Sequence, residues 1–201
     1  MSGLGADNRR MALELKGLQM LTDELEEERQ VGIKVINNRN DNFLGVIRGP
    51  IGTPYEKGIF QLDIEIPSEY PYEPPKVKFI TRIWHPNISS QTGAICLDIL
   101  KDAWSPALTL RTVLLSIQAL LSAPEPDDPQ DAQVASLYKS DYPRYIETAK
   151  EWTQMFAKYV SKEDKVKRFL DMGFSNEKIY FYLEKNNWDE NLALNDLLLD
   201  S

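Results

Sequence analysis

The sequence feature that most constrains the fold is a regular alternation of apolar and polar side chains over residues 59–67. Successive side chains of a strand point to opposite faces, so this segment predicts a strand with one buried face and one face in water. The nearby connections, residues 37–42 and 49–58, are too short for a helical crossover, and an antiparallel meander is therefore predicted. Its four strands are residues 31–36, 43–48, 59–67 and 76–81.

Apolar residues at helical spacing flank the predicted sheet along the chain. The pattern over residues 7–28 predicts an amphipathic helix that covers one face of the sheet. Asp128 followed by Pro129 is a typical helix start, a capping carboxylate before a proline in the first turn. The fold class is therefore α+β, with helices flanking the sheet. The helices predicted in this part of the chain span residues 7–28, 109–121, 128–138 and 143–160.

Residues 160–163 form a short polar connection, after which three brief helical segments fit into residues 164–201. Ser175 and Asp189 are the candidate caps of the second and third segments. The sequence therefore predicts a larger domain over residues 1–159 and a small three-helix bundle after the connection. The helices of the bundle are predicted at residues 164–172, 175–186 and 189–199.

The composition limits the classes of partner. A formal net charge of -8 at pH 7 disfavours nucleic acid, whose phosphates are bound by clustered Lys and Arg. No apolar run approaches the roughly 18 to 20 residues of a membrane span, and residues 1–11 lack the apolar core of a signal peptide. We therefore expect a cytoplasmic or nuclear protein with neither nucleic acid nor membrane as its partner.

The chain has one cysteine, Cys96, and one histidine, His85. An internal disulfide and the usual Cys/His zinc cage are therefore excluded, and we expect neither a metal site nor a cofactor. Cys96 is either a buried apolar filler or a reactive thiol. Residues 82–108 lack sustained periodicity yet hold both residues and two of the four tryptophans, so this segment is the candidate functional region.

Two motifs surround the cysteine, His85-Pro86-Asn87 upstream and Cys96-Leu97-Asp98 at the thiol. Together they resemble the active-site signature of the ubiquitin-conjugating enzymes, and further matches in the family's order extend over residues 7–157. The interval from Asn87 to Cys96 is one residue longer than in many members, and no acidic insertion precedes Trp104. The further matching segments are residues 49–55, 70–76, 104–108 and 126–129.

The resemblance implies that Cys96 accepts ubiquitin as a thioester from the activating enzyme and passes it to lysine amines, with extension of ubiquitin chains. Asn87 has two compatible roles, donating to the oxyanion of the transfer step or pinning the loop by bonds to the backbone. By its local sequence Asp128 is a helix cap, whereas the resemblance implies that it positions and deprotonates the incoming lysine. Asp98 could be a solvated loop charge only, and His85 a residue that fixes the loop through bonds to the backbone.

The resemblance also implies a surface on which ubiquitin ligases dock, built from two loops and the first helix. Exposed apolar loop tips often mark such contacts. The alternatives are that the loops only pack on each other and that Arg10 is a solvated helix residue. The residues implied are Tyr72, Ser105, Pro106, Ala107, Arg9 and Arg10.

Residues 163–201 resemble a ubiquitin-associated domain through Met172-Gly173-Phe174 and Leu197-Leu198. The combination of domains is similar to the two-domain, 25-kilodalton, huntingtin-interacting type of the family, expected as a monomer. The resemblance implies an apolar patch that binds ubiquitin, and the alternative is that the same residues form the core of the small domain. The implied patch is Met172, Gly173, Phe174 and Leu198.

Three other functions are compatible with parts of the sequence. A thiol hydrolase would use Cys96 with His85, but a proline follows His85 directly and there is no second histidine. A catalytically silent ubiquitin-binding adaptor would lack the cysteine. A conjugating enzyme for a ubiquitin-like modifier would have the same catalytic residues, although a ubiquitin-associated domain favours ubiquitin.

Overall fold

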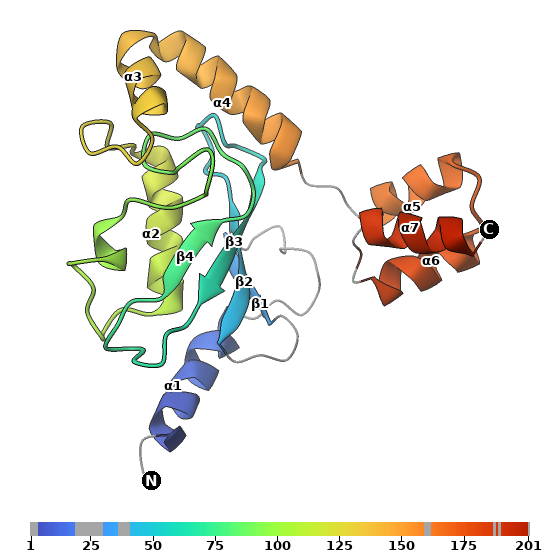
Figure 1. Cartoon of the computed structure of the whole chain (residues 1–201), viewed down its shortest axis with the longest axis horizontal. Helices are drawn as coiled ribbons and strands as arrows, with labels where there is room; N and C mark the ends of the chain where they lie inside the picture. Colours follow the sequence, from blue (N-terminus) through green and yellow to red (C-terminus); the bar gives the residue numbers. More distant parts are fainter. Residues whose placement is uncertain are drawn as a thin grey trace. The chain divides into compact units, whose positions relative to one another are not determined.

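The computed structural model describes residues 4–18, 30–35, 41–158, 162–186, 188 and 190–200 of the chain. It divides into two compact units, Met1–Lys158 and Tyr159–Ser201 (Figure 1). The first unit holds a four-stranded sheet and helices α1 to α4, and the second holds helices α5 to α7. No helix among the described residues is both long and apolar enough to cross a membrane.

The sheet is an antiparallel meander in the order β1-β2-β3-β4, which confirms the predicted topology. In β3 the side chains of Phe60, Leu62 and Ile64 are buried, whereas Gln61 and Glu65 are exposed, so the alternation that predicted the strand separates its two faces. The strands are β1 (Val31–Val35), β2 (Asn42–Arg48), β3 (Ile59–Glu65) and β4 (Lys76–Phe79).

Helix α2 (Leu110–Ser122) packs against β1 and β2 and covers one face of the sheet (Figure 1). It begins where predicted, because the hydroxyl of Thr109 accepts a hydrogen bond from the amide of Thr112 at 3.2 Å. Its apolar side is fully core-facing, and its C-terminal half therefore forms a fixed wall beside the functional region. The buried residues are Leu110, Val113, Leu114, Ile117, Leu120 and Leu121.

Helix α1 (Leu4–Lys16) is shorter than predicted and lies at one end of the sheet, so the prediction that it covers a face is wrong (Figure 1). The more apolar α2 occupies that face. The chain turns at Gly17 and buries Leu18, whose carbonyl accepts the amide of Ile33 at 2.8 Å. Leu18 therefore joins the edge of the sheet instead of continuing the helix. Residues 19–28 of the predicted helix lie outside the described residues.

Helix α3 (Ala132–Ser140) does not begin at Asp128, so that predicted helix start is wrong. Its cap is Asp131, whose carboxylate accepts the amide of Val134 at 3.2 Å. The carbonyl of Pro86 accepts the amides of Gln130 and Asp131, both at 2.9 Å, and this tertiary contact draws the residues before α3 toward the functional region. Asp128 consequently lies in a loop.

Helix α4 (Tyr142–Phe156) completes the first unit, with Asp141 as its cap and Pro143 in its first turn. Its buried side chains are those of Tyr145, Ala149 and Thr153. It ends at Phe156, before the predicted Val160, which itself lies outside the described residues.

The second unit is a three-helix bundle with its own core. Ser175 caps its second helix as predicted, by accepting the amide of Lys178. The predicted cap Asp189 and residues 160 and 161 of the predicted connection lie outside the described residues. The helices are α5 (Lys162–Asp171), α6 (Asn176–Lys185) and α7 (Glu190–Leu199). The buried core is Val166, Phe169, Ile179, Leu183, Ala193 and Leu197.

Candidate active site

The segment that carries the cysteine is a closed turn between Asn87 and Cys96. The amide of Cys96 donates to the carbonyl of Asn87 at 2.8 Å, and the amide of Ser89 donates to the carbonyl of Ala94 at 2.9 Å. Gly93 has φ 75°, and a Cβ atom there would lie 2.0 Å from the carbonyl oxygen of Phe79, so only glycine fits. The turn therefore accommodates the interval between Asn87 and Cys96, and the backbones of these two residues are hydrogen-bonded to each other.

His85 is fully buried beneath this turn. Its Nδ1 accepts the amide of Asn87 at 3.0 Å, and its Nε2 lies 3.1 Å from the carbonyl oxygen of Leu120. Burial lowers the pKa of His85 to about 4, although the bond to Leu120 opposes the shift. The ring is therefore neutral, with its proton on Nε2, and both nitrogens hold backbone groups. This arrangement matches the expected loop-fixing role and leaves no nitrogen free to act as the base of a thiol hydrolase.

Asn87 is also buried, and its amide binds the loop that contains Asp128. Its Nδ2 donates to the carbonyls of Glu125 and Asp128, both at 2.9 Å, while its Oδ1 accepts the amide of Glu125 at 2.8 Å. Of the two roles left open by the sequence, the structure displays the loop-pinning one. Donation to an oxyanion would require one of these bonds to open.

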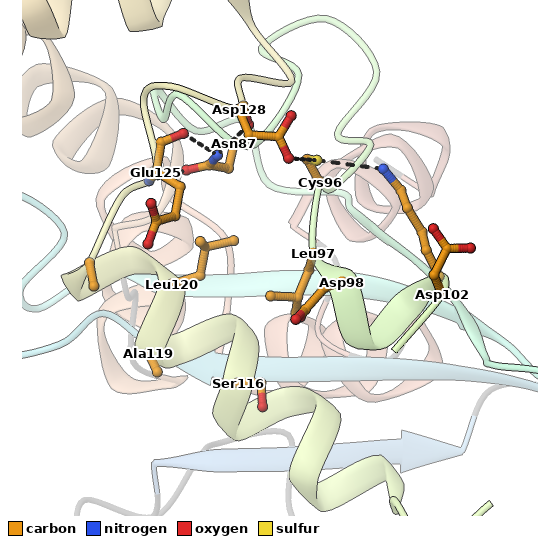
Figure 2. A pocket seen from close by; sticks show the side chains of 12 residues that line it. Asn87, Cys96, Leu97, Asp98, Asp102, Ser116, Ala119, Leu120, Glu125 and Asp128 are labelled. Atoms are coloured by element: carbon orange, nitrogen blue, oxygen red, sulfur yellow. Dashed lines mark hydrogen bonds between the residues drawn. The ribbon is translucent and has the colours of Figure 1, made fainter. Parts of the chain in front are cut away.

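Cys96 is half-buried, which excludes the fully buried apolar filler. Its thiol donates to Oδ2 of Asp128 across 3.6 Å, and Nζ of Lys101 lies 3.5 Å from Sγ (Figure 2). A short 3-10 turn, η1 (Asp98–Leu100), brings Lys101 back to the thiol. The sequence predicted Cys96 and Asp128 but not Lys101, because an exposed lysine in a loop carries no signal of its neighbours.

These residues line a groove of 740 Å³ beside α2 (Figure 2). Most of the charged side chains around it are acidic, and Lys101 is the basic one. Asp98, the first residue of the 3-10 turn, is exposed, and its Oδ1 accepts the amide of Ile99 at 2.7 Å. The acidic side chains lining the groove are Asp98, Asp102, Glu125 and Asp128.

The predicted ligase surface consists of two loops that touch each other. Nε1 of Trp104 donates to the carbonyl of Pro71 at 2.8 Å, and the rings of Tyr70 and Trp104 lie 5.9 Å apart. Tyr72 remains 77% exposed at the tip of the first loop. The two loops therefore pack on each other and still expose the side chain of Tyr72, so the two interpretations of these loops are compatible. The exposed members of the second loop are Ser105, Pro106 and Ala107.

The two arginines of α1 behave differently. Arg9 is exposed, whereas Arg10 donates to Glu14 at 2.7 Å and to the carbonyl of Leu108 at 2.8 Å. The hydroxyl of Tyr70 donates to the same Glu14 carboxylate at 2.8 Å. Arg10 is therefore a residue that fastens α1 to the paired loops, and the alternative of a purely solvated Arg10 is wrong. Sequence periodicity did not reveal Glu14, because its partners are distant in the chain.

In the second unit, the predicted patch divides into exposed and packed residues. Met172 is 59% exposed and Leu198 is 60% exposed. Phe174 is half-buried, and its ring lies 6.2 Å from that of the core residue Phe169. Gly173 between them has φ 93°, a conformation that favours glycine. Met172 and Leu198 are therefore available to a partner, and Phe174 belongs partly to the core.

Among the residues that the structure describes, no group of three or more His, Cys, Asp or Glu side chains is placed to hold a metal ion. The groups that line the groove are a thiol, carboxylates, an amide and an amine.

The chain is similar in sequence to known ubiquitin-conjugating enzymes. A family model described as ubiquitin-conjugating enzyme matches residues 10–153. The chain is 59% identical over 169 residues to ubiquitin-conjugating enzyme E2 27 of Arabidopsis thaliana, covering 83% of this chain and 88% of the relative. It is 48% identical over 184 residues to the human ubiquitin-conjugating enzyme E2 K, covering 90% of this chain and 92% of the relative.

The solved E2 domain of a ubiquitin conjugating enzyme from Toxoplasma gondii is similar in fold. It has a TM-score of 0.70 at 55% identity and covers 76% of this chain and 99% of that structure. The match to the human relative is longer, since 90% of the chain exceeds the first unit, Met1–Lys158 of 201 residues. Sequence similarity to that relative therefore continues into the second unit.

Proposed function

The chain belongs to the ubiquitin-conjugating enzyme family, and from this premise we propose that it carries ubiquitin as a thioester on Cys96. Enzymes of this family interact with ubiquitin, an activating enzyme and ubiquitin ligases. The observation that carries the proposal is the half-buried thiol beside the Asp128 carboxylate, 3.6 Å away in an open groove. Cys96 is the only cysteine in the chain and hence the only possible thioester carrier.

Loading exchanges one thioester for another. The Cys96 thiol gives up its proton, and the resulting thiolate attacks the terminal carbonyl carbon of ubiquitin on the activating enzyme. A new C–S bond forms, the C–S bond to the activating enzyme breaks, and the cysteine of that enzyme leaves as a thiolate, which takes up a proton from solvent. A thioester is already activated, so this step depends on orientation more than on a base. Both nitrogens of His85 are bound to backbone groups, so this residue is not available as a base.

Transfer would use the carboxylate of Asp128. The lysine amine attacks the carbonyl carbon, the C–N bond forms, the C–S bond breaks, and Cys96 leaves as a thiolate. The attacking nitrogen must lose a proton, and Asp128, whose Oδ2 lies 3.6 Å from the sulfur, would orient the amine and accept that proton. Asn87 supports this role by holding the backbone of Asp128 through the 2.9 Å bond to its carbonyl.

We extend the proposal to two surfaces. The exposed loop tip with Tyr72 and the loop 105–107, with Arg9, would contact ubiquitin ligases, and Arg10 would hold α1 against them. Met172 and Leu198 would contact ubiquitin, and weak binding there would favour extension of ubiquitin chains. Such an enzyme would work as a monomer in the cytoplasm or nucleus.

The test is an incubation with ubiquitin, activating enzyme and ATP, analysed on a non-reducing gel. Wild type should gain one ubiquitin mass that disappears with excess thiol, and Cys96→Ser should gain a thiol-resistant ester. A thiol-sensitive adduct on Cys96→Ala would contradict the assignment. Parallel incubation with ubiquitin-like modifiers and their activating enzymes decides the choice of modifier, and loading by such a modifier alone would overturn ubiquitin.

A further inference from the structure

The contact between Ser90 and Asp131 joins two parts of the active site that are 41 residues apart. Ser90 donates twice to Oδ2 of Asp131, from its hydroxyl at 2.7 Å and from its amide at 3.0 Å. The other carboxylate oxygen, Oδ1, accepts the amide of Val134 in the first turn of α3. One carboxylate therefore binds the cysteine-bearing turn through one oxygen and caps a helix through the other.

The loop between α2 and α3 depends on contacts of this kind, because residues 123–131 form neither helix nor strand. Asn87 holds it at Glu125 and Asp128, and the carbonyl of Pro86 holds it at the amides that precede α3. The Ser90 contact is the last of these bonds toward α3. All of these bonds are made by residues 86, 87 and 90, so this short stretch holds the loop at several points.

The same stretch also sets the position of the thiol. The amide of Cys96 is bonded to the carbonyl of Asn87, and Ile88 pairs with Ile95 across the turn. Ser90 lies in that turn. Movement of the turn relative to the loop would therefore change the separation between Cys96 and Asp128, and the bond to Asp131 opposes such movement.

The electrostatics of Asp131 agree with a strong contact. Partial burial acts to raise the pKa of this carboxyl, but hydrogen bonds from Ser90 and from the amides at the start of α3 outweigh it, so the pKa lies below its usual value. Asp131 is thus charged at neutral pH, and hydrogen bonds to a charged acceptor are stronger than neutral ones.

We propose that Ser90 and Asp131 are positioning residues for ubiquitin transfer, holding the loop so that the Asp128 carboxylate stays beside Cys96. This inference rests on the proposed function, because it assigns Asp128 a role in the transfer step. Neither residue touches the thiol. Their contribution is therefore confined to transfer, and loading of ubiquitin on Cys96 is independent of it.

The test uses the full chain and measures loading and single-turnover discharge to free lysine separately. Ser90→Ala removes the hydroxyl but leaves the backbone amide of residue 90 and the helix cap. Discharge should fall about tenfold, on the scale of losing one hydrogen bond to a charged group, with loading unchanged. Ser90→Thr, which keeps a hydroxyl, should restore discharge. Ser89→Ala is the matched control, since that hydroxyl bonds within the turn to the amide of Thr92.

A double-mutant comparison separates positioning from general damage. If Ser90 acts through Asp128, Ser90→Ala should cause no further loss of discharge in an Asp128→Ala background. An equal additional loss there, or wild-type discharge by Ser90→Ala, would overturn the proposal. Failure of wild type itself to load ubiquitin would instead contradict the proposed function, so the two failures are distinguishable. Thermal unfolding of each variant confirms that it is folded.

Discussion

The sulfur of Cys96 lies 3.6 Å from Oδ2 of Asp128, although 32 residues separate them along the chain. Both positions are fixed by a third residue, Asn87, whose carbonyl binds the amide of Cys96 and whose side chain binds the carbonyl of Asp128. The backbones that carry the thiol and the carboxylate are therefore both hydrogen-bonded to one buried residue, Asn87. Variants of these residues should affect the two chemical steps differently.

Substitution of Asp128 should slow transfer alone. We expect Asp128→Asn and Asp128→Ala to load ubiquitin at nearly the wild-type rate but to discharge it to lysine about tenfold more slowly or worse, because neither can accept the proton of the amine. Rates of thioester formation and of single-turnover discharge check this. Asp127→Asn is the matched control, since that side chain is exposed and pairs with Lys139. Equal slowing of both steps would point to damaged folding instead.

Substitution of Asn87 decides between its two roles. Asn87→Ala removes three hydrogen bonds to the loop and should slow discharge about tenfold or more while loading persists. If its role is only to place Asp128, the loss should be small in an Asp128→Ala background. A full additional loss there would show that the amide also serves the oxyanion. Discharge rates of the two single variants and the double variant supply the comparison.

The sequence predicted the elements of the fold more reliably than the boundaries next to the site. Alternation over β3 and the apolar side of α2 reflect burial, which acts on every residue of an element and so leaves a periodic signal. The start of α3 depends instead on a few individual hydrogen bonds to Pro86 and Ser90, which leave no periodic signal in the sequence. Asp128-Pro129 satisfied the local capping rule, but distant partners selected Asp131.

The candidate site also contains residues that the sequence revealed and residues that only tertiary contacts reveal. Cys96, Asn87 and Asp128 were identified through motifs, and the structure brings them together around one groove. Lys101 and Glu14 were missed, because each acts through contacts that the local sequence does not encode. The end of α1 was missed for a related reason, since Leu18 continues the helical period but is taken up by the sheet.

Burial of neutral His85 should make stability depend on pH. The pKa of His85 is about 4 in the folded chain and about 6.5 when the side chain is exposed. Between these two pH values the unfolded state is protonated at His85 and the folded state is not, so lowering the pH favours unfolding. Stability is therefore complete above about pH 6.5 and falls toward pH 4. Between pH 7 and pH 5 the loss should be about 2 kcal/mol, at roughly 1.4 kcal/mol per pKa unit. Denaturant unfolding at several pH values measures it, and a folded His85→Gln variant should lack this dependence.

Lys101 should become a site of self-conjugation. Its Nζ lies 3.5 Å from the sulfur that would carry ubiquitin, so the amine is held at a high effective concentration near the thioester. Without an added acceptor, loaded enzyme should slowly form a thiol-resistant adduct that mass spectrometry assigns to Lys101. Lys101→Arg should remove this adduct, whereas Lys76→Arg, at a residue paired with Glu65, should not. An unchanged adduct on Lys101→Arg would exclude the site.

The second unit should bind ubiquitin weakly and act on chains rather than on loading. Residues 162–201 contain a complete apolar core, so the fragment should fold alone and bind ubiquitin with a Kd of about 0.1 to 1 mM, as expected for a small interface. Tethering would make this binding effective by raising the local ubiquitin concentration. Met172→Ala with Leu198→Ala should abolish ubiquitin-induced NMR shifts, because both side chains are exposed and apolar.

In the full chain, that double substitution should leave Cys96 loading unchanged and alter the length or linkage of ubiquitin chains, and deletion of residues 162–201 should do the same. Phe181→Ala is the matched control, since this residue is 61% exposed on α6 but outside the predicted patch. Loss of loading on deletion would show that the second unit is a structural part of the catalytic fold. Unchanged chains on deletion would remove its role in chain extension, and an absence of NMR shifts in the wild-type fragment would remove the binding itself.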